Sequence, residues 1–380
     1  MPERSTGNQS LRIVLRFTAV AILGFLLFSF WKANTTVIAQ FGLPAEGLGW
    51  VQRARLTLNL YRQKDLLTTA APAEGESRKF SIEPDENVRM ICARLESEGF
   101  VLSGPAVCDY LVYTGSDRYL QSGTFTLRSG LNTVEVADRL SNPEARDIVL
   151  SIFPGWRLEE IAAQITNLGF NFGGEEFLTI TLNPPQALQE MLGLTAGQSL
   201  EGFFLPGTYS FEPEISALEA VTSVLRTFVA KTQELAVSER VTAAGLDFYD
   251  VVILASIIQR ETTDAGEMPL IASVFYNRLA VGMKLETDPT VQYALGFDAQ
   301  AATWWQSPLD YTDLQVDSPF NTYRYGGLPP GPISNPGLEA LTAAAQPAES
   351  PYYYFRARCD GSGTHDFSET YEEHLGKGCE

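Results

Sequence analysis

A single carboxylate, Glu261, stands at the end of an apolar helical face, in a position suited to a proton donor. The stretch VVILASIIQRE follows Asp247, a favoured N-cap residue, with Asp250 three residues further on, and it predicts a helix from Phe248. Spacings of 3, 4 and 3 place one set of side chains on the same stripe: Val251, Leu254, Ile258 and Glu261. Partial burial and a position at a helix C-terminus both disfavour the charged carboxylate. We therefore expect Glu261 to be protonated near neutral pH, as a general acid must be. The alternative is that Glu261 faces outward and pairs with Arg260 or Arg278.

The other groups that could bind a ligand or a metal give weaker patterns. His365 and His374 lie among four polar residues, Ser368, Glu369, Glu372 and Glu373, but their spacing of nine does not match a helical zinc site. We expect both histidines to be packing residues. The four cysteines, Cys92, Cys108, Cys359 and Cys379, contain no CxxC pair. No metal and no cofactor are predicted. The simplest disulfide pairing is Cys92 with Cys108 and Cys359 with Cys379, and four free thiols are the alternative.

The composition and the N-terminus limit where such a site can act. A formal charge of -19 repels phosphate backbones, so nucleic acid is a poor partner. Residues 17–31 are uncharged and follow three arginines, so we expect a cytoplasmic stub over 1–16 and a transmembrane helix over 17–38. The chain after it is then extracytoplasmic, in a protein held at the cell membrane by a single pass. A cleaved signal peptide is the alternative.

Behind the membrane helix, 39–78 is expected to be a juxtamembrane segment and linker, with the folded part beginning near Lys79. A short repeat follows at 80–95, 125–140 and 150–165, each copy an extended start, a turn and a helix. The inward positions share i, i+3, i+7 spacing: Val88, Ile91, Leu95; Thr133, Val136, Leu140; Leu158, Ile161, Ile165. A unit this small cannot be stable alone, so the copies must share a core.

The region after Ser199 is expected to be mixed. Helices are predicted over 215–234, from Phe248, and from Pro269 to Gly282, followed by loops and an aromatic strand at 352–355. The fold class is therefore α+β, with one N-terminal transmembrane helix, a small βα module and a mixed α+β domain.

Four segments in this order resemble the YceG-like family, the endolytic murein transglycosylases known as MltG. They are LEGFFLPGTYSF (200–211), LASIIQRETTDAGEMPLIASVFYNRLAVGMKLETDPTVQYALG (254–296), SPFNTYRYGGLPPGPISNPG (318–337) and YYYFRARCDGSGTHDFSETYEEH (352–374). The resemblance covers roughly residues 79 to 376. It implies a LysM-like module at 79–148 and a YceG-like catalytic domain at 149–380.

The resemblance also implies an activity and a catalytic residue. The family's glutamate in its ETT-type motif matches Glu261, and Gln259 stands where the family usually has a second Glu. Glu286 replaces a usual Gln, and Pro154 replaces the Glu of a Glu-Gly-Trp motif. The implied reaction is lytic cleavage between N-acetylmuramic acid and N-acetylglucosamine, which leaves a 1,6-anhydro end. The expected substrate contacts are Tyr276, Asn277, Glu286, Asp288, Asn321, Tyr323 and Asn335.

Two other functions are compatible with the same residues. A muramidase would use Glu286 or Asp288 as a second carboxylate to activate water. A wall-binding anchor would hold peptidoglycan glycan strands without cutting them. By family analogy, the expected protein partners are penicillin-binding proteins of the wall-synthesis machinery.

Overall fold

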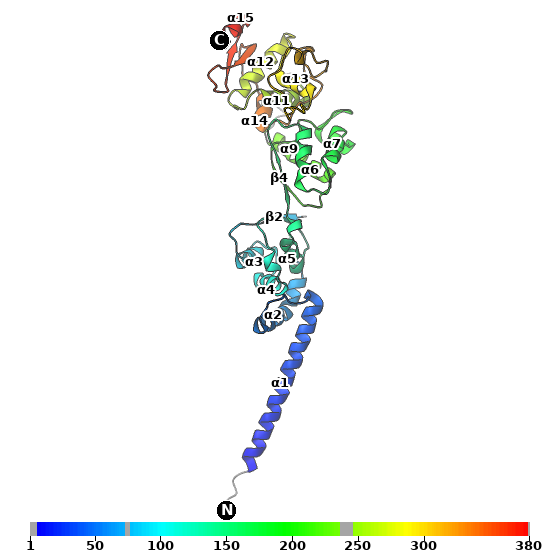
Figure 1. Cartoon of the computed structure of the whole chain (residues 1–380), viewed down its shortest axis with the longest axis vertical. Coiled ribbons are helices and arrows are strands. Elements are labelled where there is room, and N and C mark those ends of the chain that lie inside the picture. The colour runs from blue at the N-terminus through cyan, green and yellow to red at the C-terminus, as the bar shows by residue number, and fades with distance from the viewer. Residues whose placement is uncertain (1–5, 73–76, 236–245, 379–380) are drawn as a thin grey trace, which may run out of the picture. The chain divides into compact units, whose positions relative to one another are not determined.

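The computed structural model describes residues 6–72, 77–235 and 246–378, with side chains from residue 15 onward. The chain divides into two compact units, Met1–Asp147 and Ile148–Glu380, and Figure 1 shows their elements in chain order. The structure has the mixed α+β composition that the sequence predicts. The expected pairing of Cys359 with Cys379 ends outside the described residues.

The first unit begins with two helices, α1 (Thr6–Phe41) and α2 (Trp50–Thr68). Within α1, Leu15–Phe41 is long and apolar enough to cross a membrane by length and composition. The second helix corrects the expectation that the folded part begins near Lys79. Leu56, Leu60 and Leu67 of α2 are buried in the core of this unit. The buried leucines of α2 are interspersed with many charged and polar residues, so its sequence lacks a clear apolar face and resembles a linker.

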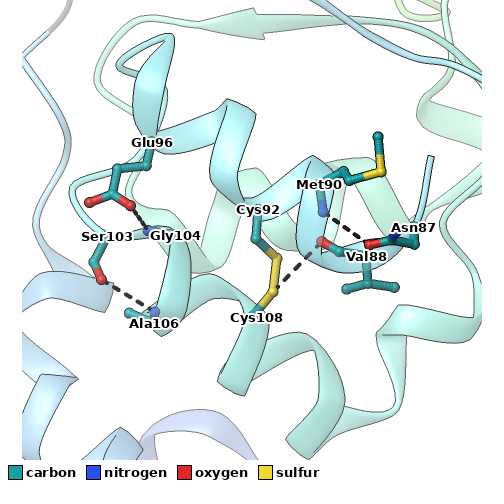
Figure 2. Close-up of a disulfide and its surroundings, with 9 residues drawn as sticks. All are labelled: Asn87, Val88, Met90, Cys92, Glu96, Ser103, Gly104, Ala106 and Cys108. Carbon is teal, nitrogen blue, oxygen red and sulfur yellow. Dashed lines mark hydrogen bonds between the residues drawn. A yellow bond between two sulfur atoms is a disulfide. The ribbon is translucent and has the colours of Figure 1, made fainter.

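A two-stranded sheet and several helices complete the first unit. The elements are β1 (Ser77–Ile82), α3 (Val88–Ser97), α4 (Gly104–Thr114), η1 (Ser116–Arg118), β2 (Gly123–Arg128), α5 (Thr133–Ser141) and η2 (Pro143–Ala145). The strands β1 and β2 pair antiparallel, with Phe80 opposite Phe125. A disulfide joins Cys92 of α3 to Cys108 of α4, as Figure 2 shows, which confirms one of the two expected pairs.

The second unit repeats this beginning and then adds a larger helical core. Its elements are β3 (Ile148–Ile152), α6 (Leu158–Leu168), α7 (Gly174–Leu182), α8 (Gln186–Leu192), β4 (Gly207–Phe211), α9 (Ala217–Glu234), α11 (Phe248–Glu261), α12 (Met268–Ala280), α13 (Asp288–Leu295), η3 (Asp313–Gln315), α14 (Leu338–Ala345), β5 (Tyr354–Ala357), β6 (His365–Ser368) and α15 (Tyr371–Gly376). β3 pairs antiparallel with β4, and β5 pairs antiparallel with β6.

All three predicted strand-turn-helix copies are present. Their predicted inward side chains are buried, apart from Val88, which is partly buried. The three copies do not all share one core, contrary to the expectation from the sequence. The first two copies pair with each other through β1 and β2 in the first unit. The third copy belongs to the second unit, where its strand β3 pairs with β4.

Helix α11 lies at the centre of the second unit. The predicted capping box is present, since the Asp250 amide donates to the Asp247 carboxylate at 2.8 Å. Residues 251–258 are all buried, so the helix is enclosed on every side and not only along the predicted stripe. α12 and α14 pack against it. The helix is partly exposed only at its two ends, over residues 248–250 and 259–261.

Candidate active site

A cavity of about 410 Å³ opens at the C-terminal end of α11, within the size range of ligand sites. One part of its lining is the end of α11. A second part runs from α12 to the start of α13 and includes Tyr323 from the loop that precedes α14. The third part is the C-terminal strand pair with α15. The lining residues are Glu261, Arg278, Leu285, Glu286, Asp288, Tyr323, Tyr354, Phe355, Arg356, Ala357, His365, Tyr371 and His374.

Glu261 is the last residue of α11 and lines this cavity. Burial raises the pKa of its carboxyl group to about 8, and the charge of Asp288 pushes in the same direction. The guanidinium groups of Arg278 and Arg260 oppose the rise without cancelling it. Glu261 is therefore protonated at neutral pH. The alternative of an outward-facing surface ion pair does not fit this position, because no ion pair of Glu261 occurs in the described part of the chain.

Asp288 and Tyr323 form a hydrogen-bonded pair beside Glu261. The Tyr323 hydroxyl donates to Asp288 Oδ1 at 2.6 Å, and burial followed by this hydrogen bond raises the pKa of Tyr323. Asp288 is also the first residue of α13 and lines the cavity. The pair presents an anionic group close to the proposed acid.

Glu286 occupies a strained position on the same wall. Its φ of 50° lies in the left-handed region, which is uncommon for a residue with a side chain. Its backbone amide donates to the Thr322 carbonyl, and its carboxylate lies 3.8 Å from the Arg278 guanidinium. Arg278 also donates to the carbonyls of Tyr353 and Leu285 at 2.7 Å each. Arg278 thus fastens the connection that carries Glu286 to the C-terminal strand pair.

Four of the expected substrate contacts do not line the cavity. The Tyr276 hydroxyl donates to the Ala344 carbonyl, and the Asn277 amide donates to the carbonyls of Ser350 and Tyr352. Asn321 and Asn335 are fully buried, and their amides also bind backbone groups. These four side chains therefore use their polar atoms to hold neighbouring backbone in place, and their contact with substrate stays a prediction.

The C-terminal wall of the cavity was not predicted as part of a site. His365 and His374, expected to be packing residues, both line the cavity together with Tyr354, Arg356 and Tyr371. His365 Nδ1 lies 2.9 Å from the Glu267 carboxylate. The clustering of these residues between 354 and 374 was a visible signal, but no periodicity linked it to a helix more than 90 residues earlier.

A second buried carboxylate, Glu201, has no pattern in the sequence that predicts its burial. It accepts hydrogen bonds from the Asn335 side chain at 2.9 Å and from the Leu158 amide at 3.2 Å. Burial raises the pKa of Glu201 to about 8. Asn335 additionally accepts from the amides of Gly202 and Phe204. Glu201 does not line the cavity, and its bonds tie the loop before β4 to the start of α6.

Known proteins resemble this chain over most of its length, including the residues of the cavity. The sequence profile of the YceG-like family matches residues 80–378. An endolytic murein transglycosylase of Bacillus subtilis strain 168 is 29% identical over 317 residues, covering 80% of this chain and 85% of the relative. One of Streptococcus pneumoniae R6 is 27% identical and covers 77% of this chain, which spans 57% of that relative. The crystal structure of a YceG-like protein from Listeria monocytogenes has a TM-score of 0.54 at 30% identity, covering 79% of this chain and 98% of that one. The chain therefore belongs to the YceG-like family.

Proposed function

We propose that this protein is an endolytic lytic transglycosylase that cuts peptidoglycan glycan strands and leaves 1,6-anhydro-N-acetylmuramic acid ends. The observation that carries the proposal is a carboxyl group, Glu261, held protonated by burial in a cavity of ligand size. The names of the relatives from Bacillus and Streptococcus support the substrate. Peptidoglycan synthesis and remodelling is then the process in which the protein acts.

In the proposed reaction, Glu261 acts first as acid and then as base. Its proton passes to the glycosidic oxygen as the bond from that oxygen to C1 of N-acetylmuramic acid breaks. The C6 hydroxyl of the same sugar then attacks C1, and its proton returns to the Glu261 carboxylate. One bond breaks and one forms, so no water is consumed. Holding the C6 hydroxyl beside C1 supplies the effective concentration that a second catalytic residue would otherwise provide.

The neighbouring polar groups have supporting roles in this proposal. The Asp288 carboxylate, fixed by its hydrogen bond from Tyr323, stabilises the positive charge that develops at C1. It also helps to keep Glu261 protonated. Glu286, on the same wall, contacts the sugar from its strained backbone position. No cluster of three or more metal-binding side chains occurs within 6–72, 77–235 and 246–378, and the proposed steps need none.

The first unit is proposed to hold the enzyme at its substrate. Leu15–Phe41 of α1 would cross the cell membrane once, with the remainder of the chain extracytoplasmic, in agreement with the arginines at the N-terminus. The order β1, α3, α4, β2, with antiparallel strands, supports a LysM-like module that binds glycan. Penicillin-binding proteins are the proposed protein partners, since they make the strands that this enzyme would cut.

Digestion of purified sacculi tests the proposal. The wild-type protein should release fragments with anhydro ends, lighter by one water than hydrolysis products. Glu261→Gln should lower the rate about 100- to 10,000-fold, which is the usual contribution of general acid catalysis. Glu286→Gln, at a second glutamate of the cavity, should still give anhydro product, because Glu286 is proposed to contact the sugar and not to donate the proton. Reducing ends instead of anhydro ends would contradict the proposal.

The muramidase alternative keeps one observation in its favour, because Asp288 lies in the same cavity as Glu261. A retaining or inverting hydrolase would need that carboxylate as nucleophile or base. In that case Asp288→Asn would abolish product as fully as Glu261→Gln, and product mass would show the added water. Binding of sacculi without any release of fragments would identify a wall anchor instead.

A further inference from the structure

Among the described residues, one cation of the cavity has neither an ion pair nor a hydrogen bond. Arg356 lines the cavity, and within the described part of the chain its guanidinium makes no ion pair and no hydrogen bond. The next arginine along the chain, Arg358, lies just past the end of β5 and is paired with Asp366 at 3.1 Å. The other cavity arginine, Arg278, is occupied by backbone carbonyls and by Glu286. In a chain of net charge -19, an unpaired half-buried guanidinium points to an anionic ligand.

Aromatic rings extend from Arg356 along the same wall. Tyr354 lies two residues before Arg356 on β5, so both side chains project to the same face of the strand. The Tyr354 ring lies 5.8 Å from that of Tyr371 and 5.5 Å from that of His374. Tyr371 is 55% exposed. The His374 ring lies 6.2 Å from the Tyr371 ring and completes this aromatic wall.

The charges of the cavity are separated between its walls. Glu286 and Asp288 are on the wall formed around the start of α13, where Arg278 pairs with Glu286, whereas the guanidinium of Arg356, unpaired among the described residues, belongs to the strand pair. An anionic ligand group is repelled by the first wall and attracted by the second. The substrate of the proposed reaction carries such a group on the sugar that is attacked, because the lactyl ether of N-acetylmuramic acid bears a peptide with free carboxylates.

We propose that Arg356, together with His374 and the rings of Tyr354 and Tyr371, binds the carboxylate-bearing peptide stem of the muramic acid residue at the scissile bond. This inference rests on the proposed function. The stem leaves the same sugar ring whose C1 must lie beside Glu261, so it must run along a wall of this cavity. A guanidinium matches a carboxylate in two parallel hydrogen bonds, which a neutral glycan does not offer. The enzyme would therefore prefer strands that still carry their stems.

The test compares two forms of one substrate. Glycan strands with stems and the same strands stripped of stems by an amidase are digested, and kcat and KM for anhydro ends are measured on each. For the wild type, kcat/KM should be at least about tenfold higher on stem-bearing strands. Arg356→Gln should reduce that ratio about tenfold, mainly through KM, because a charge-assisted hydrogen bond is lost. Arg358→Gln, a change of the same type two residues further along the chain and outside the cavity lining, should leave the ratio unchanged.

A second measurement does not depend on a variant folding. Amidating the stem carboxylates removes the same charge from the ligand, and wild-type protein should then cut the treated strands with a KM close to that for stripped strands. Equal kcat/KM of wild type on stem-bearing and stripped strands would overturn the inference while anhydro ends still supported the enzyme activity. An equal loss on both substrates in Arg356→Gln would overturn it as well. Absence of anhydro ends from either substrate would overturn the proposed function, and the stem site with it.

Discussion

Two segments of the chain, 77–128 and 148–211, arrange the same elements in the same order. We call them the first frame and the second frame. Each runs from a strand through a helix pair to an antiparallel strand, β1 with β2 in the first frame and β3 with β4 in the second. The second frame has the additional helix α8 before its last strand.

The likeness extends to the contact between the two helices. In the first frame, the Gly104 amide donates to the Glu96 carboxylate, as Figure 2 shows, and a Cβ on Gly104 would meet the Cys92 carbonyl oxygen at 2.6 Å. In the second frame, the Gly174 amide donates to the Thr166 hydroxyl, and a Cβ on Gly174 would meet the Ala162 carbonyl oxygen at 2.3 Å. The second helix of each frame thus begins with a glycine because the first helix lies too close for a side chain.

The frames differ in what holds them. The disulfide of the first frame links Cys92 to Cys108, which are 16 residues apart. The equivalent positions of the second frame are Ala162 and Leu178, which cannot form a disulfide. The second frame packs instead into the core of the larger unit and is tied to distant loops by Glu201 and Asn335. A small unit is stabilised covalently, whereas a larger core can bury polar groups and position an acid.

The largest expected effect is at the polar tie of the second frame. Asn335→Ala removes hydrogen bonds to Trp156, Glu201, Gly202 and Phe204 and should lower the free energy of unfolding by about 4 kcal/mol, at about 1 kcal/mol for each. Urea unfolding measures it. The exposed Asn167→Ala is the control and should change stability by less than about 0.5 kcal/mol. A stable Asn335→Ala protein with a raised KM would restore Asn335 as a sugar contact.

Removing the disulfide should affect the first frame alone. Replacing Cys92 and Cys108 with Ala should cost about 3 kcal/mol, since a loop near this length is restrained in the unfolded chain. Hydrogen exchange, read separately for residues of each frame, measures the loss. If amides of the second frame lost equal protection, the two frames would not be independently stabilised.

The glycine contacts should be equivalent in the two frames. Gly104→Ala and Gly174→Ala should each cost about 2 kcal/mol, because the added methyl group meets a backbone oxygen that cannot move aside. Gly326→Ala is the control, since nothing lies within 4 Å of its Cβ position. Thermal unfolding compares the three. A neutral Gly174→Ala would show that the second frame is packed more loosely than the first.

A further expected effect depends on pH and concerns the acid that the second unit carries. The pKa of Glu261 in the folded protein, about 8, lies above its value in the unfolded chain. Its protonated form therefore contributes stability that is present at low pH and is lost as pH rises through about 8. Glu261→Gln should be relatively more stable than the wild type at pH 9 than at pH 5, by urea unfolding at both values. An unchanged difference would indicate an ordinary carboxyl pKa.

The sequence predicts well what depends on near neighbours. Periodicity located α3, α5, α6 and α11, and it placed Glu261 at the end of a buried helix, because helical faces follow from residues three and four apart. Partners far apart in the chain were not predictable from spacing. Arg356 reaches the cavity because β5 pairs with β6. Asn335 is buried because its side chain donates to the Trp156 carbonyl and to Glu201, which lie far away in the sequence. Helix α2 was missed because its charges obscured three buried leucines.

The proposed reaction begins with the proton of Glu261, and the pH dependence of kcat/KM on stem-bearing strands measures that proton directly. We expect activity to fall as pH rises through about 8, where the buried carboxyl group loses its proton. A rate that falls already near pH 5, or one that stays constant beyond pH 9, would contradict the role of Glu261 as a protonated acid.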